Sequence, residues 1–182
     1  MTILWKRLDQ PGTEWCQLKA GGEKAIRGVV VFNYEMMPCR MEYIIKCGSS
    51  WETRSASITG QIGNKSVSRQ IKVDAIKHWF VDGKRVGAVD GCIDIDLGFS
   101  PSTNLLPIRR LRMRLGERRE VRAAWVEFPS LKVKLLNQIY LRSGRGTFSY
   151  ESEEGSFKRE LLVNKTGLVL RYPGYWEVEA VV

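Results

Sequence analysis

The sequence predicts an all-β protein: a long antiparallel sheet curled into a spiral β-roll or half-open barrel, with little helix. Apolar residues recur at every second position, and Gly, Asn and Asp turn signals separate these stretches. No segment keeps a helical apolar spacing over several turns. Of the 182 residues, 43% are hydrophobic, which is enough for one core. Because no Pro/Gly/Ser-rich linker interrupts the chain, we predict one domain over residues 1–182.

The predicted strands follow one another along the chain, each with an apolar and a polar face. They cover residues 40–47, 52–62, 67–74, 109–115 and 131–142, and a short strand ends near Leu97. Chain reversals are predicted at Gly63-Asn64, Asp82-Gly83 and Gly116-Glu117. Helix is expected only as a turn or two at residues 102–106.

The most informative stretch is residues 90–111, which combines three acids, an amide and two arginines with two prolines. On a strand, Asp94 and Asp96 would share one face, before the prolines break the ladder. The acids could bind a cation or act as an acid/base pair. They could instead pair with Arg109 or Arg110, which we favour because burying an unpaired carboxylate costs several kcal/mol.

Two residue types in this region allow a structural and a functional interpretation. Asn104 is expected to be a turn residue that bonds its own backbone, or less often a ligand donor. Arginines at positions 110, 112 and 114, with Arg122 on the next strand, would form a basic stripe on a chain of net charge +9. Such a stripe could follow phosphates, but few aromatic residues are interleaved with it, so nucleic-acid binding is the least favoured hypothesis.

The sequence lacks the motifs that define several classes of enzyme and nucleotide-binding protein. The sequence has no nucleophile elbow, zincin motif, phosphate-binding loop or dinucleotide fingerprint. His78 is the single histidine, and the four cysteines include no C-x-x-C pair, so we predict no metal and no cofactor. No apolar run is long enough to span a membrane. The start reaches charge too early for a secretory signal, so we expect a cytoplasmic protein with reduced thiols.

The chain resembles a known bacterial family in four stretches that cover nearly its whole length. The longest is Asp90 to Leu97 followed by Ser100-Pro101 and Thr103 to Leu111. The others are Trp51-x-Thr53-Arg54, then Pro129-x-Leu131-x-Val133 with Gln138-x-Tyr140, then Gly167 to Gly174. These stretches are similar to the bacterial glycolipid-binding family, formerly a domain of unknown function.

This resemblance implies a β-roll similar to the half-open barrels of periplasmic lipoprotein carriers, and it implies no catalytic residues. Our first hypothesis is therefore a non-enzymatic binder that holds an amphipathic small molecule, such as a glycolipid, in the concave face. Arg54, Arg109 or Arg110 would meet its head, and Trp51, Trp79 and Tyr140 would line the apolar part. An enzyme that acts on a sugar or lipid through Asp94 and Asp96 is the alternative. The candidate ligand-binding residues are Trp51, Arg54, Trp79, Asp94, Asp96, Asn104, Arg109, Arg110, Gln138, Tyr140 and Tyr172.

Overall fold

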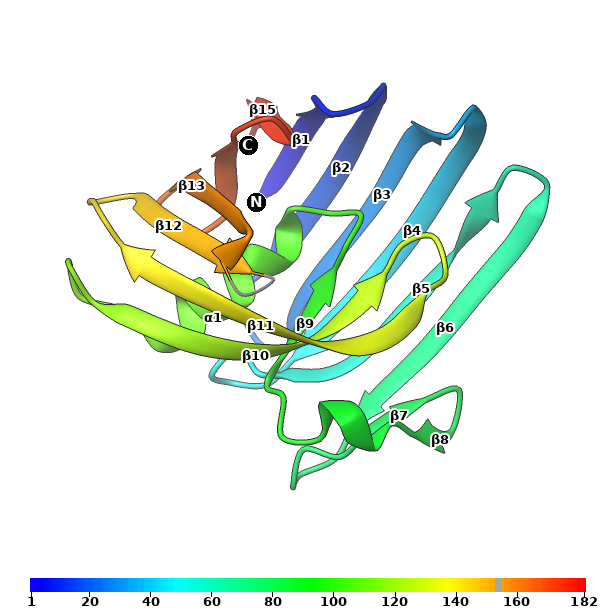
Figure 1. Ribbon diagram of the computed structural model, residues 1–182, viewed down its shortest axis with the longest axis horizontal. Helices are drawn as coiled ribbons and strands as arrows, with labels where there is room; N and C mark the ends of the chain where they lie inside the picture. Colours follow the sequence, from blue (N-terminus) through cyan, green and yellow to red (C-terminus); the bar gives the residue numbers. More distant parts are fainter. Residues whose placement is uncertain (153–154) are drawn as a thin grey trace.

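The computed structural model describes residues 1–152 and 155–182, and it confirms the all-β prediction. Fifteen strands form one curled sheet that does not close into a barrel (Figure 1). Their order across the sheet is β8-β7-β6-β5-β4-β3-β2-β1-β15-β14-β13-β12-β11-β10-β9. The elements are β1 (Thr2–Arg7), β2 (Gly12–Lys19), β3 (Lys24–Tyr34), β4 (Met37–Cys47), β5 (Thr53–Ile62), β6 (Lys65–Val73), β7 (Trp79–Val81), β8 (Lys84–Arg85), η1 (Gly87–Val89), β9 (Asp94–Leu97), η2 (Ser102–Asn104), α1 (Leu105–Leu111), β10 (Arg118–Glu127), β11 (Lys132–Arg142), β12 (Thr147–Ser152), β13 (Phe157–Val163), β14 (Val169–Tyr172) and β15 (Trp176–Val181).

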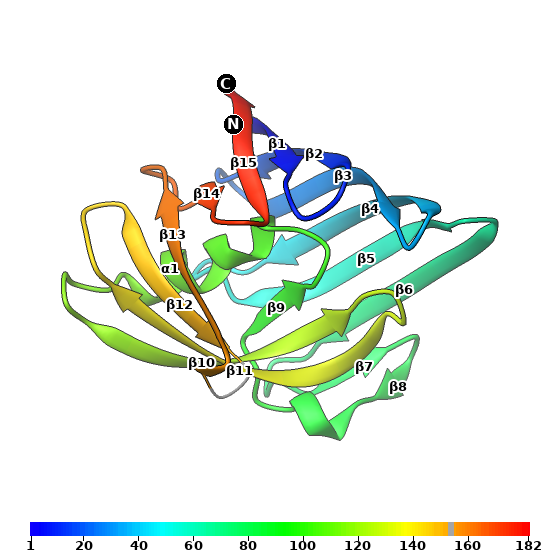
Figure 2. The same ribbon diagram turned by 45° about the horizontal axis from the view of Figure 1, so that its top comes forward.

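The two halves of the chain form the two halves of the sheet, which meet where the terminal strands pair. Strand β1 pairs antiparallel with β15, as at the partners Trp5 and Val178. At one edge, β9 pairs parallel with β10, which is the one parallel pairing among the described strands. The curl brings β9 over the inner face of the other half (Figure 2). There the Thr53 amide bonds the carbonyl of Ile93, and the Thr53 hydroxyl accepts the Ile95 amide.

Side chains fill the concave face of the first half of the sheet. Large residues from β1, β4 and β7 point inward, and β9, η2 and α1 cover them. Trp5, Trp79 and Phe99 are each no more than 1% exposed. In this half of the sheet the concave face is therefore a packed core, and burying its apolar surface stabilises the fold.

A second, smaller core lies inside the other half of the sheet, between β10 to β14 and the end of α1. Helix α1 joins the two cores, because Leu105 and Leu106 pack in the first and Ile108 packs in the second. The strand predicted at residues 109–115 is therefore wrong. The chain is helical to Leu111, and Arg112 then adopts a left-handed backbone with φ of 47°. As a result, the arginines at 110, 112 and 114 do not share a strand face.

Gly28 of β3 lies close to a side chain of the first core, and its replacement gives a testable prediction. A Cβ at this position would lie 2.5 Å from the hydroxyl of Tyr43, which is buried and bonded to Glu14 and Ser102. We expect Gly28→Ala to reduce the free energy of unfolding by about 1–3 kcal/mol through overpacking. Urea denaturation measures this loss. Gly21→Ala is the matched control, since no atom lies within 4 Å there; equal effects at both sites would contradict the packing argument.

Candidate functional site

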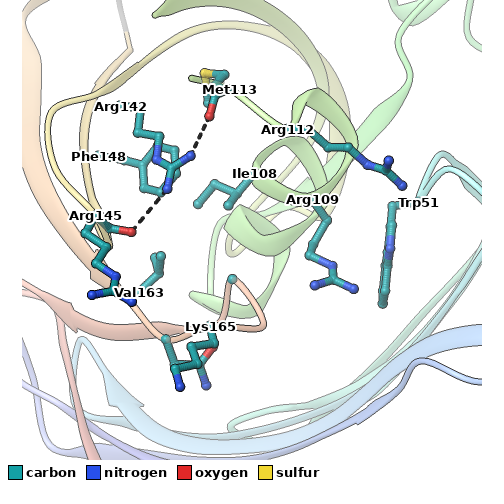
Figure 3. Close-up of a pocket in the computed structure, with 12 residues that line it drawn as sticks. Trp51, Ile108, Arg109, Arg112, Met113, Arg142, Arg145, Phe148, Val163 and Lys165 are labelled. Carbon is teal, nitrogen blue, oxygen red and sulfur yellow. Dashed lines mark hydrogen bonds between the residues drawn. The ribbon is translucent and has the colours of Figure 1, made fainter. Parts of the chain in front are cut away.

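A cavity of about 570 Å³ opens at one end of the second core, and we call it the mouth cavity (Figure 3). Four segments surround it: the end of α1, the turn between β4 and β5, the turn between β11 and β12, and the turn between β13 and β14. The β13–β14 turn packs on the helix, since a Cβ at Gly167 would lie 3.4 Å from Ile108 and Arg109. The lining residues are Trp51, Ile108, Arg109, Arg112, Met113, Arg142, Arg145, Phe148, Val163, Asn164, Lys165 and Gly167.

The rim of the mouth cavity is strongly cationic. Its lining includes five cations and no carboxylate: Arg109, Arg112, Arg142, Arg145 and Lys165. None of these five makes an ion pair within residues 1–152 and 155–182, whereas other cations of the chain do pair with acids, such as Arg40 with Glu42 and Lys134 with Glu127. Like charges that converge without compensation repel one another and create a positive potential. The cavity therefore attracts anions.

Two of the arginines are held in place by the protein itself. The Arg142 guanidinium donates to the carbonyl of Met113 at 2.7 Å and to that of Arg145 at 3.3 Å (Figure 3). The Arg109 guanidinium lies over the Trp51 indole, 5.2 Å from the ring centroid. Trp51 itself adopts a left-handed backbone with φ of 71°, which turns the chain so that its ring faces α1.

The floor of the mouth cavity is apolar. It consists of Ile108, Met113, Phe148 and Val163, which belong to the second core and are each at most 8% exposed. An apolar floor beneath a cationic rim matches a molecule with an anionic head and an apolar body.

A second cavity, of about 190 Å³, lies further along β12, and we call it the aromatic cleft. Asp96 lies within it, and its Oδ2 accepts a hydrogen bond from Gln138 Nε2 at 2.5 Å. Burial raises the pKa of Asp96 to about 6, against the lowering effect of that hydrogen bond. The lining residues are Asp96, Leu97, Gly98, Ser100, Pro101, Asn104, Trp125, Leu136, Tyr150, Ser152, Phe157, Tyr172, Tyr175 and Trp176.

The structure distributes the sequence-predicted residues between these two cavities. Trp51 and Arg109 line the mouth cavity, whereas Asp96, Asn104 and Tyr172 line the aromatic cleft. Gln138 is buried behind Asp96 and bonds it. Asn104 also has the predicted turn role, because its Nδ2 donates to the carbonyl of Pro101.

Six predicted residues line neither of these cavities: Gln138, the pair Asp94 and Arg110, and Trp79, Tyr140 and Arg54. Trp79 is fully buried and its Nε1 donates to the carbonyl of Cys92. Tyr140 is 1% exposed and donates its hydroxyl to Asn104. Arg54 is exposed beside Glu52. The expectation that Trp79 and Tyr140 line the apolar part of a binding groove is therefore wrong, because both rings are core packing.

Asp94 and Arg110 pair with each other, as the favoured interpretation of the sequence expected. Arg110 donates through Nε and Nη2 to the two carboxylate oxygens of Asp94, at 3.1 and 2.5 Å. Asp94 is 1% exposed, and burial raises its pKa while the hydrogen bonds from Arg110 lower it. Both oxygens of this carboxylate are thus occupied within the fold.

Sequence reasoning missed Arg142, Arg145 and Lys165. All three lie in or beside hairpin turns, and turns two strands apart in an antiparallel sheet lie at the same end. That rule, applied to β11–β12 and β13–β14, would have placed these cations together. Among the described residues, no group of three His, Cys, Asp or Glu side chains could hold a metal ion, and no helix is long and apolar enough to cross a bilayer.

The fold and its cavities define an all-β roll with a cationic cavity at its mouth. The family model described as "Putative glycolipid-binding" matches residues 2–178, so the chain belongs to this family, as the resemblance indicated. A crystal structure of a DUF1089 family protein from Pseudomonas aeruginosa is similar, with a TM-score of 0.84 and 33% sequence identity. The match covers 91% of each chain. A search of curated proteins finds no match.

Proposed function

We propose that this protein binds an anionic amphipathic molecule, such as an acidic glycolipid, in the mouth cavity. The observation that carries the proposal is the set of five cations, without a carboxylate, above an apolar floor. The description of the family, which names glycolipid binding, supports the same ligand class.

In this proposal the cations of the rim bind the anionic head of the ligand, and the apolar floor contacts its apolar part. Arg109 and Arg142 are half-buried and held by Trp51 and by backbone carbonyls, so their charges are in place before a ligand arrives. Arginine pairs well with phosphate and carboxylate oxygens because its guanidinium can donate two parallel hydrogen bonds. The apolar part of the ligand would cover Ile108 and Phe148 on the floor. The volume falls within the range of small-molecule sites, about 300–1,000 Å³.

No specific observation favours the two other hypotheses, which are an enzyme that uses Asp94 and Asp96 and a nucleic-acid-binding protein. The enzyme hypothesis required Asp94 and Asp96 to act as a pair, and Asp94 is neutralised by Arg110, so the two carboxylates are not a free acid/base pair. The arginine stripe expected for nucleic acid depended on a strand that the structure replaces with helix α1.

Lipid titration tests the proposed function. We expect isothermal titration calorimetry to detect binding of monomeric lysophosphatidylglycerol, whose head is anionic, and much weaker binding of zwitterionic lysophosphatidylcholine. The double variant Arg109→Gln/Lys165→Gln should bind the anionic lipid at least about tenfold more weakly, since each lost charge-assisted hydrogen bond contributes about 1.5–3 kcal/mol.

The matched control is Lys72→Gln/Lys84→Gln, which removes the same charge from β6 and β8, outside the mouth cavity. It should bind like the unmodified protein. Equal affinity for both lipids, or equal weakening in both double variants, would show that the mouth cavity does not select an anionic head.

A further inference from the structure

The aromatic cleft has a built wall of rings that the proposed function does not use. Six aromatic side chains line it, and neighbouring rings meet at fixed angles. Tyr172 and Tyr175 lie 5.3 Å apart between centroids, Phe157 and Tyr175 lie 5.5 Å apart, and Tyr150 and Tyr172 lie 6.2 Å apart. Such edge-to-face and tilted contacts fix the orientation of the rings. The wall is therefore already formed without a ligand.

Trp125 completes this wall from β10. Its indole lies against the backbone of Gly98, where an added Cβ would be 2.7 Å from Nε1. Trp125 and Tyr172 are both partly exposed, so part of each ring is accessible in the cleft.

Asp96 is the charged group of the cleft, and its environment differs from that of Asp94. Asp94 is neutralised by Arg110, whereas Asp96 makes no ion pair with any residue that the structure describes. Its Oδ2 bonds Gln138, and no donor in the described parts of the chain bonds its Oδ1. Asp96 remains partly exposed, and it lines the cleft. The carboxylate therefore has acceptor capacity available to a hydroxyl group that enters the cleft.

Two arginines limit what this cleft can take. The Arg159 guanidinium lies over Phe157 and Tyr175, at 4.8 and 5.5 Å from the centroids. Arg7 lies over Trp176 at 5.2 Å. These rings already have cationic partners, so an organic cation would meet like charge there, in a chain whose net charge is +9. An anion would be repelled by Asp96 in its ionised form. An uncharged ligand rich in hydroxyl groups avoids both conflicts.

We propose that the aromatic cleft binds one uncharged sugar ring. The C–H face of a pyranose would pack on Trp125 and Tyr172, and its hydroxyl groups would donate to Asp96 Oδ1. A cavity lined by aromatic rings together with a few placed polar groups is a common form of small-ligand site. This inference goes beyond the anionic head of the proposed function and uses other residues. Strand β12 gives Phe148 to the mouth cavity, and Tyr150 and Ser152 to the aromatic cleft.

Saturation-transfer NMR with neutral methyl glycosides of glucose, galactose and mannose tests the proposal. Irradiating the protein should transfer saturation to the ring C–H protons of at least one glycoside at millimolar concentration. Trp125→Leu should reduce this transfer several-fold, and Asp96→Asn should reduce it while the melting curve confirms that the variant is folded. Trp15→Leu is the control, because Trp15 is an exposed indole of β2 outside the cleft.

The outcomes separate this proposal from the proposed function. Arg109→Gln/Lys165→Gln should keep the sugar signal even though it loses the anionic lipid. No transfer to any of the three glycosides would overturn the sugar proposal. Transfer that survives Trp125→Leu would also overturn it, and so would Asp96-dependent binding of choline in place of sugar, which would make the cleft a cation site.

Discussion

Raising the pH from about 5 to about 9 is expected to destabilise this protein, and Glu14→Gln is expected to remove a large part of that loss. Glu14 lies on β2, is fully buried, and has a pKa raised to about 8 by burial. Its Oε1 accepts hydrogen bonds from Tyr43 and Ser100, both at 2.6 Å. Its Oε2 is buried without a hydrogen-bond partner. The native state therefore favours the neutral, protonated acid.

The direction of the pH effect follows from the two pKa values. Below pH 4.5, the pKa of Glu14 in the unfolded chain, the carboxyl is protonated in both states, so its titration does not lower the free energy of unfolding. Between 4.5 and about 8 the unfolded chain releases the proton while the folded chain keeps it, so stability falls as pH rises. At about 1.4 kcal/mol per pKa unit, the loss is on the order of 4–5 kcal/mol.

Glu14→Gln keeps an oxygen acceptor for Tyr43 and Ser100 and cannot ionise. Urea denaturation of both proteins at several pH values measures the difference in their free energies of unfolding. Other titrating groups, Asp96 included, are common to both proteins, so the difference isolates Glu14. As pH rises from 4.5 to 8, we expect the free energy of unfolding of the variant to increase relative to that of the unmodified protein. Parallel pH profiles would contradict the buried neutral acid.

Arg110→Met is expected to reduce the free energy of unfolding by about 3–5 kcal/mol at neutral pH, because it leaves the buried carboxylate of Asp94 without its partner. The pair is bidentate and Asp94 is 1% exposed, so water does not replace the lost donors. The pair connects α1 with β9, the strand that lies over the inner face of the sheet.

Two comparisons make this second prediction specific to a buried charge. Asp94→Leu/Arg110→Met removes both charges and should recover most of the loss, since no unpaired charge remains. Arg118→Met breaks a pair with Glu120 that is exposed on both sides, and it should cost less than about 1 kcal/mol. Chemical denaturation of the three variants decides the matter. A double variant as unstable as Arg110→Met would mean that packing, and not charge, is lost.

The sequence predicted the strands best where a period of two extended over many residues. Residues 52–62 and 131–142 match β5 and β11 within one residue at each end. The shorter alternation at 109–115 misled, because Leu111 is the last residue of α1, and Met113 and Leu115 lie in the connection that follows it. Packing decided it: Leu106 and Ile108 enter two different cores, which a helical turn allows.

The pairing of Asp94 with Arg110 could be predicted because the cost of an unpaired buried carboxylate holds in any fold. The state of Glu14 could not. Glu14 is one residue within strand β2. Only folding brings to it Tyr43, which lies on β4, and Ser100, which lies in the turn before η2. Asp94 and Asp96 likewise look equivalent in sequence, yet only Asp94 meets an arginine.

The all-β class was predictable from the amino-acid sequence because alternating polarity and turn chemistry are local properties of the chain, and the family was indicated by the four motif stretches that resemble it. The sequence also predicted a cationic character that suits an anionic partner. Only the tertiary structure decided where a ligand could bind. The curl of the sheet fills the concave face with Trp79 and Phe99 and leaves openings at the mouth cavity and the aromatic cleft. Trp51 and Lys165, which are far apart in the sequence, then line the same cavity, and no local sequence pattern predicts that they come together.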